Sequence, residues 1–238
     1  LLEGGILLNL DTEEDDEIGV GCAGGIDVTA TRSYEEEETP ESKIGFTIEV
    51  KGLQGGHSGM DIHRGLGNAN KLMNRLLFDT FESFGLRISE IDGGSLRNAI
   101  PRESRAVVAV DAVHEAAFVE AMNFKANAIK TELKTMEPQL EVIISATDAP
   151  EKIMDLGIQE GLLRALYATL NGVYRMSADI EGLVETSNNI ARVIVNANVN
   201  NDNIQKILNF VSQQENINAL ILDDNHITNM IPIIPWDE

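Results

Sequence analysis

The order of hydrophobic periods between residues 43 and 146 restricts this chain to a small set of folds. Residues 43–51 alternate apolar and polar positions, as a half-buried strand does. Apolar residues then recur at helical spacing over 62–81 and over 114–136. Further strand patterns occupy residues 86–91, 106–110 and 140–146. This β-α-β-β-α-β order predicts an α+β fold, a split β-α-β (ferredoxin-like) antiparallel sheet with helices on one face.

A similar rhythm begins again after residue 150. The patterns predict helices over 158–173 and 202–211, and strands over 181–185, 190–195 and 217–222. No sequence repeat accompanies this order, so a second similar unit is predicted from the rhythm alone. Four glutamates at 35–38, followed by Pro40, indicate a solvated connector, and we expect a domain boundary there.

The charge of the chain excludes some classes of partner. The sequence has 39 acidic and 18 basic residues, a formal net charge of -21. Because binding to phosphate backbones depends on Lys and Arg, we expect no nucleic-acid partner and no anionic membrane surface. No apolar run approaches the roughly 20 residues that span a bilayer. A single cysteine excludes an internal disulfide, and a cytoplasmic protein is expected.

One histidine is placed as a candidate catalytic group. His57 lies in the run Gly55-Gly56-His57-Ser58-Gly59, between a predicted strand and a predicted helix. The glycines permit tight turns and leave the imidazole exposed near backbone N–H groups, where it is suited to stabilise an oxyanion. A turn with an incidental histidine fits the spacing equally well.

Two further residues are candidates for binding. Asp11 ends the apolar run 6–10, and carboxylates at strand ends are common metal ligands, although one carboxylate makes no site. Asn98 lies in a loop stiffened by Pro101, where its amide would bond a substrate. A turn asparagine that bonds its own backbone is slightly favoured there. The glycines of residues 19–24 match a dinucleotide-binding spacing only loosely.

Several ordered blocks together resemble one enzyme family over residues 1–195. Leu8-Asn9-Leu10-Asp11, Gly56-His57-Ser58-Gly59 and Ser95-Leu96-Arg97-Asn98 are among the segments that carry the resemblance; the blocks are 8–14, 21–25, 51–59, 65–72, 93–103, 171–177 and 182–189. They are similar to the di-zinc metallopeptidases of the aminoacylase and carboxypeptidase superfamily. Within it, the chain most resembles the aminoacyl-histidine (Xaa-His) dipeptidases.

The resemblance implies a domain organisation and a role for each candidate. Such hydrolases have a catalytic domain with two zinc ions and an inserted lid domain that mediates dimerisation. Residues 1–40 are then a remnant of the catalytic domain with a connector, 41–195 the lid, and 196–238 its continuation or a divergent tail. Asp11 would be a metal ligand, His57 would steady the oxyanion, and Asn98 would bind the dipeptide.

The sequence also departs from the family pattern. The other metal ligands of the family belong before Asp11 and in a C-terminal stretch, and neither set is present. The arginine expected near 198–200 to hold the substrate carboxylate is missing as well. We therefore expect a lid and dimerisation part that binds Zn²⁺ weakly or not at all and is inactive alone. The alternatives are a stand-alone dimerisation or regulatory module without catalysis, and a nucleotide-binding protein.

Overall fold

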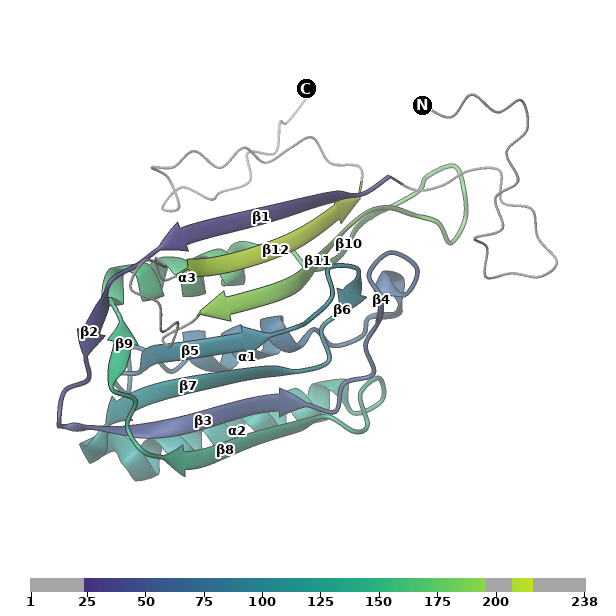
Figure 1. Cartoon of the computed structure of the whole chain (residues 1–238). Coiled ribbons are helices and arrows are strands. Elements are labelled where there is room, and N and C mark those ends of the chain that lie inside the picture. Colours follow the sequence, from purple (N-terminus) through teal and green to yellow (C-terminus); the bar gives the residue numbers. More distant parts are fainter. Residues whose placement is uncertain (1–23, 196–206, 216–238) are drawn as a thin grey trace, which may run out of the picture.

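The computed structural model describes residues 24–195 and 207–215 (Figure 1). Asp11, the predicted strands 6–10 and 217–222, and Gly19 and Gly21 lie outside these ranges. The strands are β1 Ile26–Ser33, β2 Glu36–Glu38, β3 Lys43–Lys51, β4 Gly56–His57, β5 Arg87–Gly93, β6 Ala99–Ile100, β7 Ser104–Asp111, β8 Glu141–Thr147, β9 Lys152–Met154, β10 Gly172–Met176, β11 Val184–Val195 and β12 Ile207–Glu215. The helices are α1 Ala69–Phe78, α2 Glu115–Leu133 and α3 Leu156–Ala168, with short 3-10 turns η1 Ile62–Arg64 and η2 Ala112–His114.

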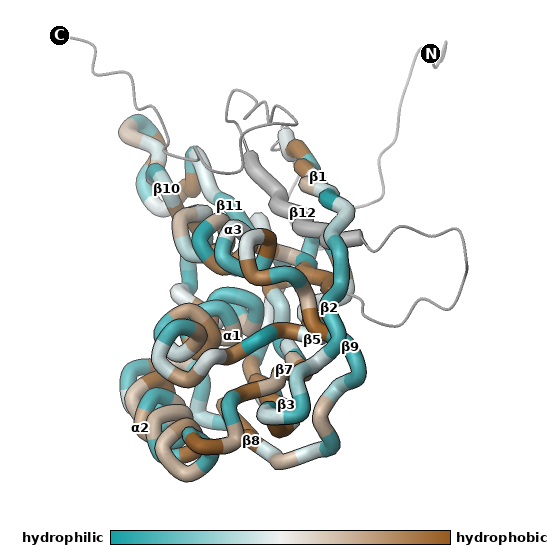
Figure 2. The backbone as a smooth tube through the Cα atoms, turned by 90° about the vertical axis from the view of Figure 1, so that its left-hand side faces the viewer, coloured by the Kyte–Doolittle hydropathy of each residue, from teal (hydrophilic) through white to brown (hydrophobic). Residues whose placement is uncertain are grey.

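Eight strands form one antiparallel sheet, which confirms the predicted α+β class. Their order is β1-β12-β11-β5-β7-β3-β8, and β10 pairs with β11 beside this path. Strand β7 lies between β3 and β5, although α1 connects those two strands in the sequence. Helices α1, α2 and α3 pack on the same face of the sheet (Figures 1 and 2). None of the helices in the described part of the chain has the length and hydropathy needed to cross a membrane.

The core lies between the sheet and the helices because alternate strand residues face the apolar side of each helix. Phe46 and Ile48 of β3 are buried, and the ring of Phe46 lies 5.0 Å from that of Phe118 in α2. Helix α1 buries Leu76 and Leu77 and contacts both neighbouring helices. Alternation along β3 and helical spacing along α1 therefore give each element one apolar face, as the sequence predicted.

The helix predicted over 62–81 is shorter than expected. Only residues 62–64 form a 3-10 turn before Gly65, whose φ of 71° is a left-handed conformation that ends the turn. Helix α1 starts afterwards, because the Asn68 side chain accepts the Lys71 N–H as an N-cap. The local apolar spacing runs through this break, so periodicity alone did not reveal it.

The predicted second unit is wrong, because the later strands extend the first sheet. Residues 184–195 form one continuous strand, β11, which includes the end of the predicted strand 181–185 and all of 190–195 and pairs with β5, β10 and β12. The helix predicted over 202–211 is also wrong where the structure describes it, since 207–215 is strand β12 between β1 and β11. Pairing on both edges overrides a weak helical pattern. The helix predicted over 158–173 ends at Ala168, and β10 begins at Gly172.

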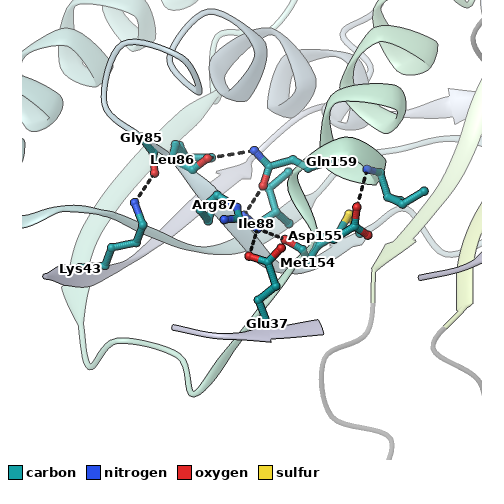
Figure 3. Close-up of polar contacts among 10 residues, drawn as sticks. Glu37, Lys43, Gly85, Leu86, Arg87, Ile88, Met154, Asp155 and Gln159 are labelled. Carbon is teal, nitrogen blue, oxygen red and sulfur yellow. Dashed lines mark hydrogen bonds and ion pairs between the residues drawn. The ribbon is translucent and has the colours of Figure 1, made fainter. Parts of the chain in front are cut away.

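A buried glutamine attaches α3 to the start of β5 (Figure 3). The Gln159 amide donates to the Leu86 carbonyl at 2.9 Å and accepts the Ile88 N–H at 2.7 Å. Gln159 thereby supplies partners to two backbone groups at the start of β5, and it is fully buried. Nearby, Arg87 bonds Glu37 of β2 and the Met154 carbonyl of β9.

Candidate functional site

The structure brings His57 and Asn98 together on one surface. Strands β4 and β6 form a small antiparallel pair in which His57 is opposite Ala99. The Ser58 N–H donates to the Asn98 carbonyl at 2.9 Å. The side chains of His57 and Asn98 are both exposed. Two candidates from separate loops therefore lie next to each other, although the main sheet does not include either strand.

Backbone donors fix the state of the His57 ring. Nδ1 accepts the N–H of Gly59 at 3.1 Å and that of Met60 at 3.2 Å. A nitrogen that accepts hydrogen bonds carries no proton, so the neutral ring has its proton on Nε2. No residue in the described ranges accepts a hydrogen bond from Nε2. The ring therefore presents one N–H donor to the outside.

Asp61 closes the turn that holds His57. The His57 backbone N–H donates to Asp61 Oδ2 at 2.8 Å, and the Asp61 N–H donates to the His57 carbonyl at 3.0 Å. Arg64 pairs with the other carboxylate oxygen at 3.0 Å. The His57 N–H, and after it the Arg64 guanidinium, hold the pKa of Asp61 below its ordinary value of 3.8.

Gly55 allows the histidine loop to approach the loop of Asn98. Its φ is 66°, and a Cβ at this position would lie 2.4 Å from Cγ of Arg102. Arg102 in turn donates from Nε to the Leu53 carbonyl at 3.2 Å. A side chain at position 55 would therefore be strained in its backbone and would push the two loops apart.

Buried asparagines support the pair from behind. The Asn68 amide donates to the Asn171 side chain at 2.8 Å and to the Asn189 side chain at 3.1 Å. The Asn189 amide donates to the Ala99 carbonyl at 2.8 Å. This chain of amides connects α1, β11 and β6, and because Ala99 follows Asn98, it fixes the backbone of the Asn98 loop.

The side chain of Asn98 itself is free in the part of the chain that the structure describes. It makes no bond to its own backbone there, in contrast to the turn asparagine that the loop sequence favoured. An exposed amide with both groups available can donate and accept at once. Asn98 is therefore placed to hydrogen-bond a ligand that reaches this surface.

The histidine and the asparagine lie on an open surface. A groove of about 1040 Å³ runs over the polar face of the sheet beside the Asn98 loop, and Leu96, Ala99 and Arg192 line it. Neither His57 nor Asn98 lines this groove. Because catalytic sites enclose their substrates, a second surface has to cover these two side chains before they can act on one.

The residues described by the structure do not provide a metal centre. In the ranges 24–195 and 207–215, no group of three or more His, Cys, Asp or Glu side chains could hold a metal ion. Zinc sites in enzymes need three protein ligands or more. The described donors therefore do not fit the zinc pair that the resemblance implies, and Asp11 lies outside the described residues.

Sequence reasoning did not identify the residues that support the site. Asn68, Asn171 and Asn189 lie in blocks that carried the resemblance, and Asp61 follows the histidine loop. Their pairing depends on contacts between distant segments, for which one sequence carries no signal. The only local clue was Asn68 ahead of an apolar helix, which is typical of an N-cap.

Known proteins match this chain over much of its length. Residues 48–137 match the family model described as "Peptidase dimerisation domain". The chain is 41% identical over 197 residues to the cytosol non-specific dipeptidase of Escherichia coli (strain K12), covering 83% of this chain and 41% of that protein. The crystal structure of the aminoacylhistidine dipeptidase from Vibrio alginolyticus superposes with a TM-score of 0.79 at 37% identity, covering 90% of this chain and 42% of that one. The chain thus spans about two fifths of the length of these relatives.

Proposed function

Because this chain carries a dimerisation domain of the M20 peptidase family, we propose that it is the lid and dimerisation part of a metal-dependent dipeptidase that hydrolyses Xaa-His dipeptides. The observation that carries the proposal is the exposed pair of His57 and Asn98, held together by β4 and β6. Two relatives that cover most of this chain are named dipeptidases.

His57 supplies a hydrogen-bond donor to the substrate. Its Nδ1 is occupied by two backbone N–H groups, so Nε2–H points away from the loop as the available donor. When water attacks a peptide carbonyl, negative charge develops on the carbonyl oxygen. A donor already oriented toward that oxygen stabilises the transition state more than the ground state, and thus raises kcat.

Asn98 binds the dipeptide next to that donor. Its free amide can accept the substrate N–H or donate to a substrate carbonyl or carboxylate. The Asn68 and Asn189 amides hold its loop against β11, so the position is fixed before substrate binds. Fixed groups lose little entropy on binding and set the orientation of the scissile bond.

The metal chemistry of the proposed reaction requires residues outside the described ranges. Zinc bound there would polarise the carbonyl and supply the attacking water. Asp11 is proposed as one ligand on the grounds of the resemblance. The described residues contribute binding and orientation, and the open surface of the loop pair fits a lid that closes over a metal-bearing domain.

The proposal includes a homodimer formed through this domain and a cytoplasmic location. The match to a peptidase dimerisation domain supports the dimer, and the E. coli relative is named a cytosol dipeptidase. The division into 1–40, 41–195 and 196–238 is proposed as well. Residues 26–38 of the first part pair with strands of the other two parts, because β1 pairs with β12 and β2 pairs with β9.

Steady-state kinetics on an assembled peptidase, meaning this chain together with a metal-binding domain, test the proposal. With an Xaa-His dipeptide, Asn98→Ala should raise KM by about tenfold, because a ground-state hydrogen bond is lost. Glu82→Ala, at an exposed position between α1 and β5, is the control and should leave both constants unchanged. If Asn98→Ala behaves like the control, the regulatory-module alternative is favoured over the lid.

A further inference from the structure

One buried carboxylate contacts both ends of the histidine loop. Glu137 lies in the turn between α2 and β8, and only 2% of its surface is exposed. None of the ion pairs among the described residues includes it. Burying a carboxylate is costly unless hydrogen bonds replace its water. Its partners therefore indicate what it does.

Those partners are backbone donors on either side of His57. Glu137 Oε2 accepts the Gln54 N–H at 2.7 Å, and Oε1 accepts the Gly67 N–H at 2.8 Å. Gln54 precedes the histidine and Gly67 follows it, so one side chain joins the two arms of the segment 54–67. Hydrogen bonds to an ionised oxygen are about twice as strong as neutral ones.

Glu137 is itself fixed by its backbone. Its N–H donates to the Leu133 carbonyl at 2.7 Å, and its carbonyl accepts the Leu140 N–H at 3.1 Å. The neighbouring Met136 carbonyl accepts a bond from the Gln54 side-chain amide. The end of α2 is therefore a rigid base from which the carboxylate reaches the loop.

We propose that Glu137 is a positioning residue, which holds the segment 54–67 closed and thereby fixes the orientation of the His57 imidazole. Its importance for catalysis rests on the proposed function of His57, whereas its effect on the loop does not. Closure keeps Gly59 and Met60 where their N–H groups reach Nδ1. With the arms released, the ring is free to turn and both of its tautomers become populated.

Two substitutions distinguish the effect of the charge of the Glu137 side chain from the effect of its length. Glu137→Gln has the same length but can offer only one acceptor, so its NH₂ group faces one of the two N–H donors. Glu137→Asp keeps the charge and is one methylene shorter, so that it cannot reach both arms. Glu132→Gln is the matched control, since Glu132 lies at the end of α2, just before the turn that carries Glu137, and among the described residues its exposed side chain pairs only with Arg75.

Amide hydrogen exchange and the ¹⁵N signals of the His57 ring, measured on the full chain, test this inference. In Glu137→Gln, the Gln54 and Gly67 amides should exchange about tenfold faster or more, and the ring should shift toward mixed tautomers. Glu137→Asp should loosen at least one arm, and Glu132→Gln should change neither signal.

Two results with Glu137→Gln would overturn the inference. The first is unchanged exchange protection of the Gln54 and Gly67 amides. The second is an equally large acceleration of exchange in the core strands β3 and β7, which would mean that Glu137 stabilises the whole fold. If Glu137→Gln does not fold, normal protection and a single tautomer in a folded Glu137→Asp overturn it as well. Neither readout involves turnover, so the inference can fail while the role of His57 holds, and the reverse.

Discussion

The Ser58 N–H donates to the Asn98 carbonyl at 2.9 Å, and this bond joins the histidine loop to the asparagine loop. Asp61 closes the histidine loop on itself by bonding His57 and Arg64, and Glu137 ties that loop to the turn after α2. Asn189 of β11 ties the asparagine loop to the sheet. The two exposed side chains are therefore held at a fixed spacing by backbone contacts, while the side chains themselves remain available for a ligand.

Replacing His57 by Ala should reduce turnover without weakening the fold. In an assembled peptidase, kcat should fall roughly 10²–10³-fold with little change in KM, because an oxyanion donor acts in the transition state. The free energy of unfolding should change by less than about 0.5 kcal/mol, since the ring is exposed and water can bond the freed N–H groups.

His63→Ala is the control for that measurement. His63 is exposed in η1 and follows the same loop. It should leave both kcat and the unfolding energy unchanged. A kcat retained in His57→Ala, or a strong loss of stability, would show that His57 is a structural turn residue.

The histidine loop should loosen in acid because of Asp61. The pKa of Asp61 in the folded chain is below 3.8, so its bonds to the His57 N–H and to Arg64 add stability that is fully present above 3.8. This contribution is lost as the pH falls through the lower, folded-state pKa. The His57 amide shift, followed by NMR during acid titration, should report the transition.

Asp61→Asn removes the titrating group and should abolish that step. The exposed Asp148 lies outside the loop, and Asp148→Asn should leave the step in place. An unaltered acid transition of the His57 amide shift in Asp61→Asn would disprove the assignment.

Gln159→Leu should destabilise the fold by roughly 2–4 kcal/mol. The apolar side chain fits the buried position but leaves the Leu86 carbonyl and the Ile88 N–H without partners. Urea unfolding should show a lower midpoint at an unchanged slope. Gln139→Leu on the surface should change stability by less than about 0.5 kcal/mol. Equal effects of the two substitutions would mean that the buried amide contributes nothing.

This chain alone should not hydrolyse dipeptides, even with added Zn²⁺. The described residues lack a group that could hold a metal, and zinc affinity needs a complete set of ligands. The measurement is cleavage of an Xaa-His dipeptide by the chain, with the E. coli relative as a positive control. Turnover clearly above the blank would contradict the proposal that hydrolysis requires a separate metal-binding domain.

The chain should self-associate through the side of the domain that carries α2 and β8. Helix α1 packs against α2 and α3 and buries its apolar residues. Strand β8 ends the order of the sheet, and Phe124 of α2 is 76% exposed. An open edge and an exposed ring are features of association surfaces.

Light scattering should therefore show a dimer that Phe124→Lys weakens. Tyr174→Lys on β10 is the control, because Tyr174 is also exposed but lies on a different strand. A strict monomer at high concentration, or equal weakening by both substitutions, would argue against this surface.

The part of the fold that the sequence predicted best is the part with clean local periods. Strand β3 matches its prediction at 43–51, and α2 and β8 lie within about three residues of theirs. Local pattern failed where a glycine interrupts it, at Gly65, and where pairing overrides it, in β12. The exposed position of His57 followed from the glycines around it.

By itself, the sequence determined which residues face the core, because apolar spacing along one element is a local property of the chain. It also placed His57 and Asn98 in loops. Only the tertiary structure decided that β11 and β12 extend one sheet and that β4 pairs with β6. It alone shows Glu137 between Gln54 and Gly67. These contacts join segments far apart in the chain, and their stability comes from burial and hydrogen bonds that exist only once the chain has folded.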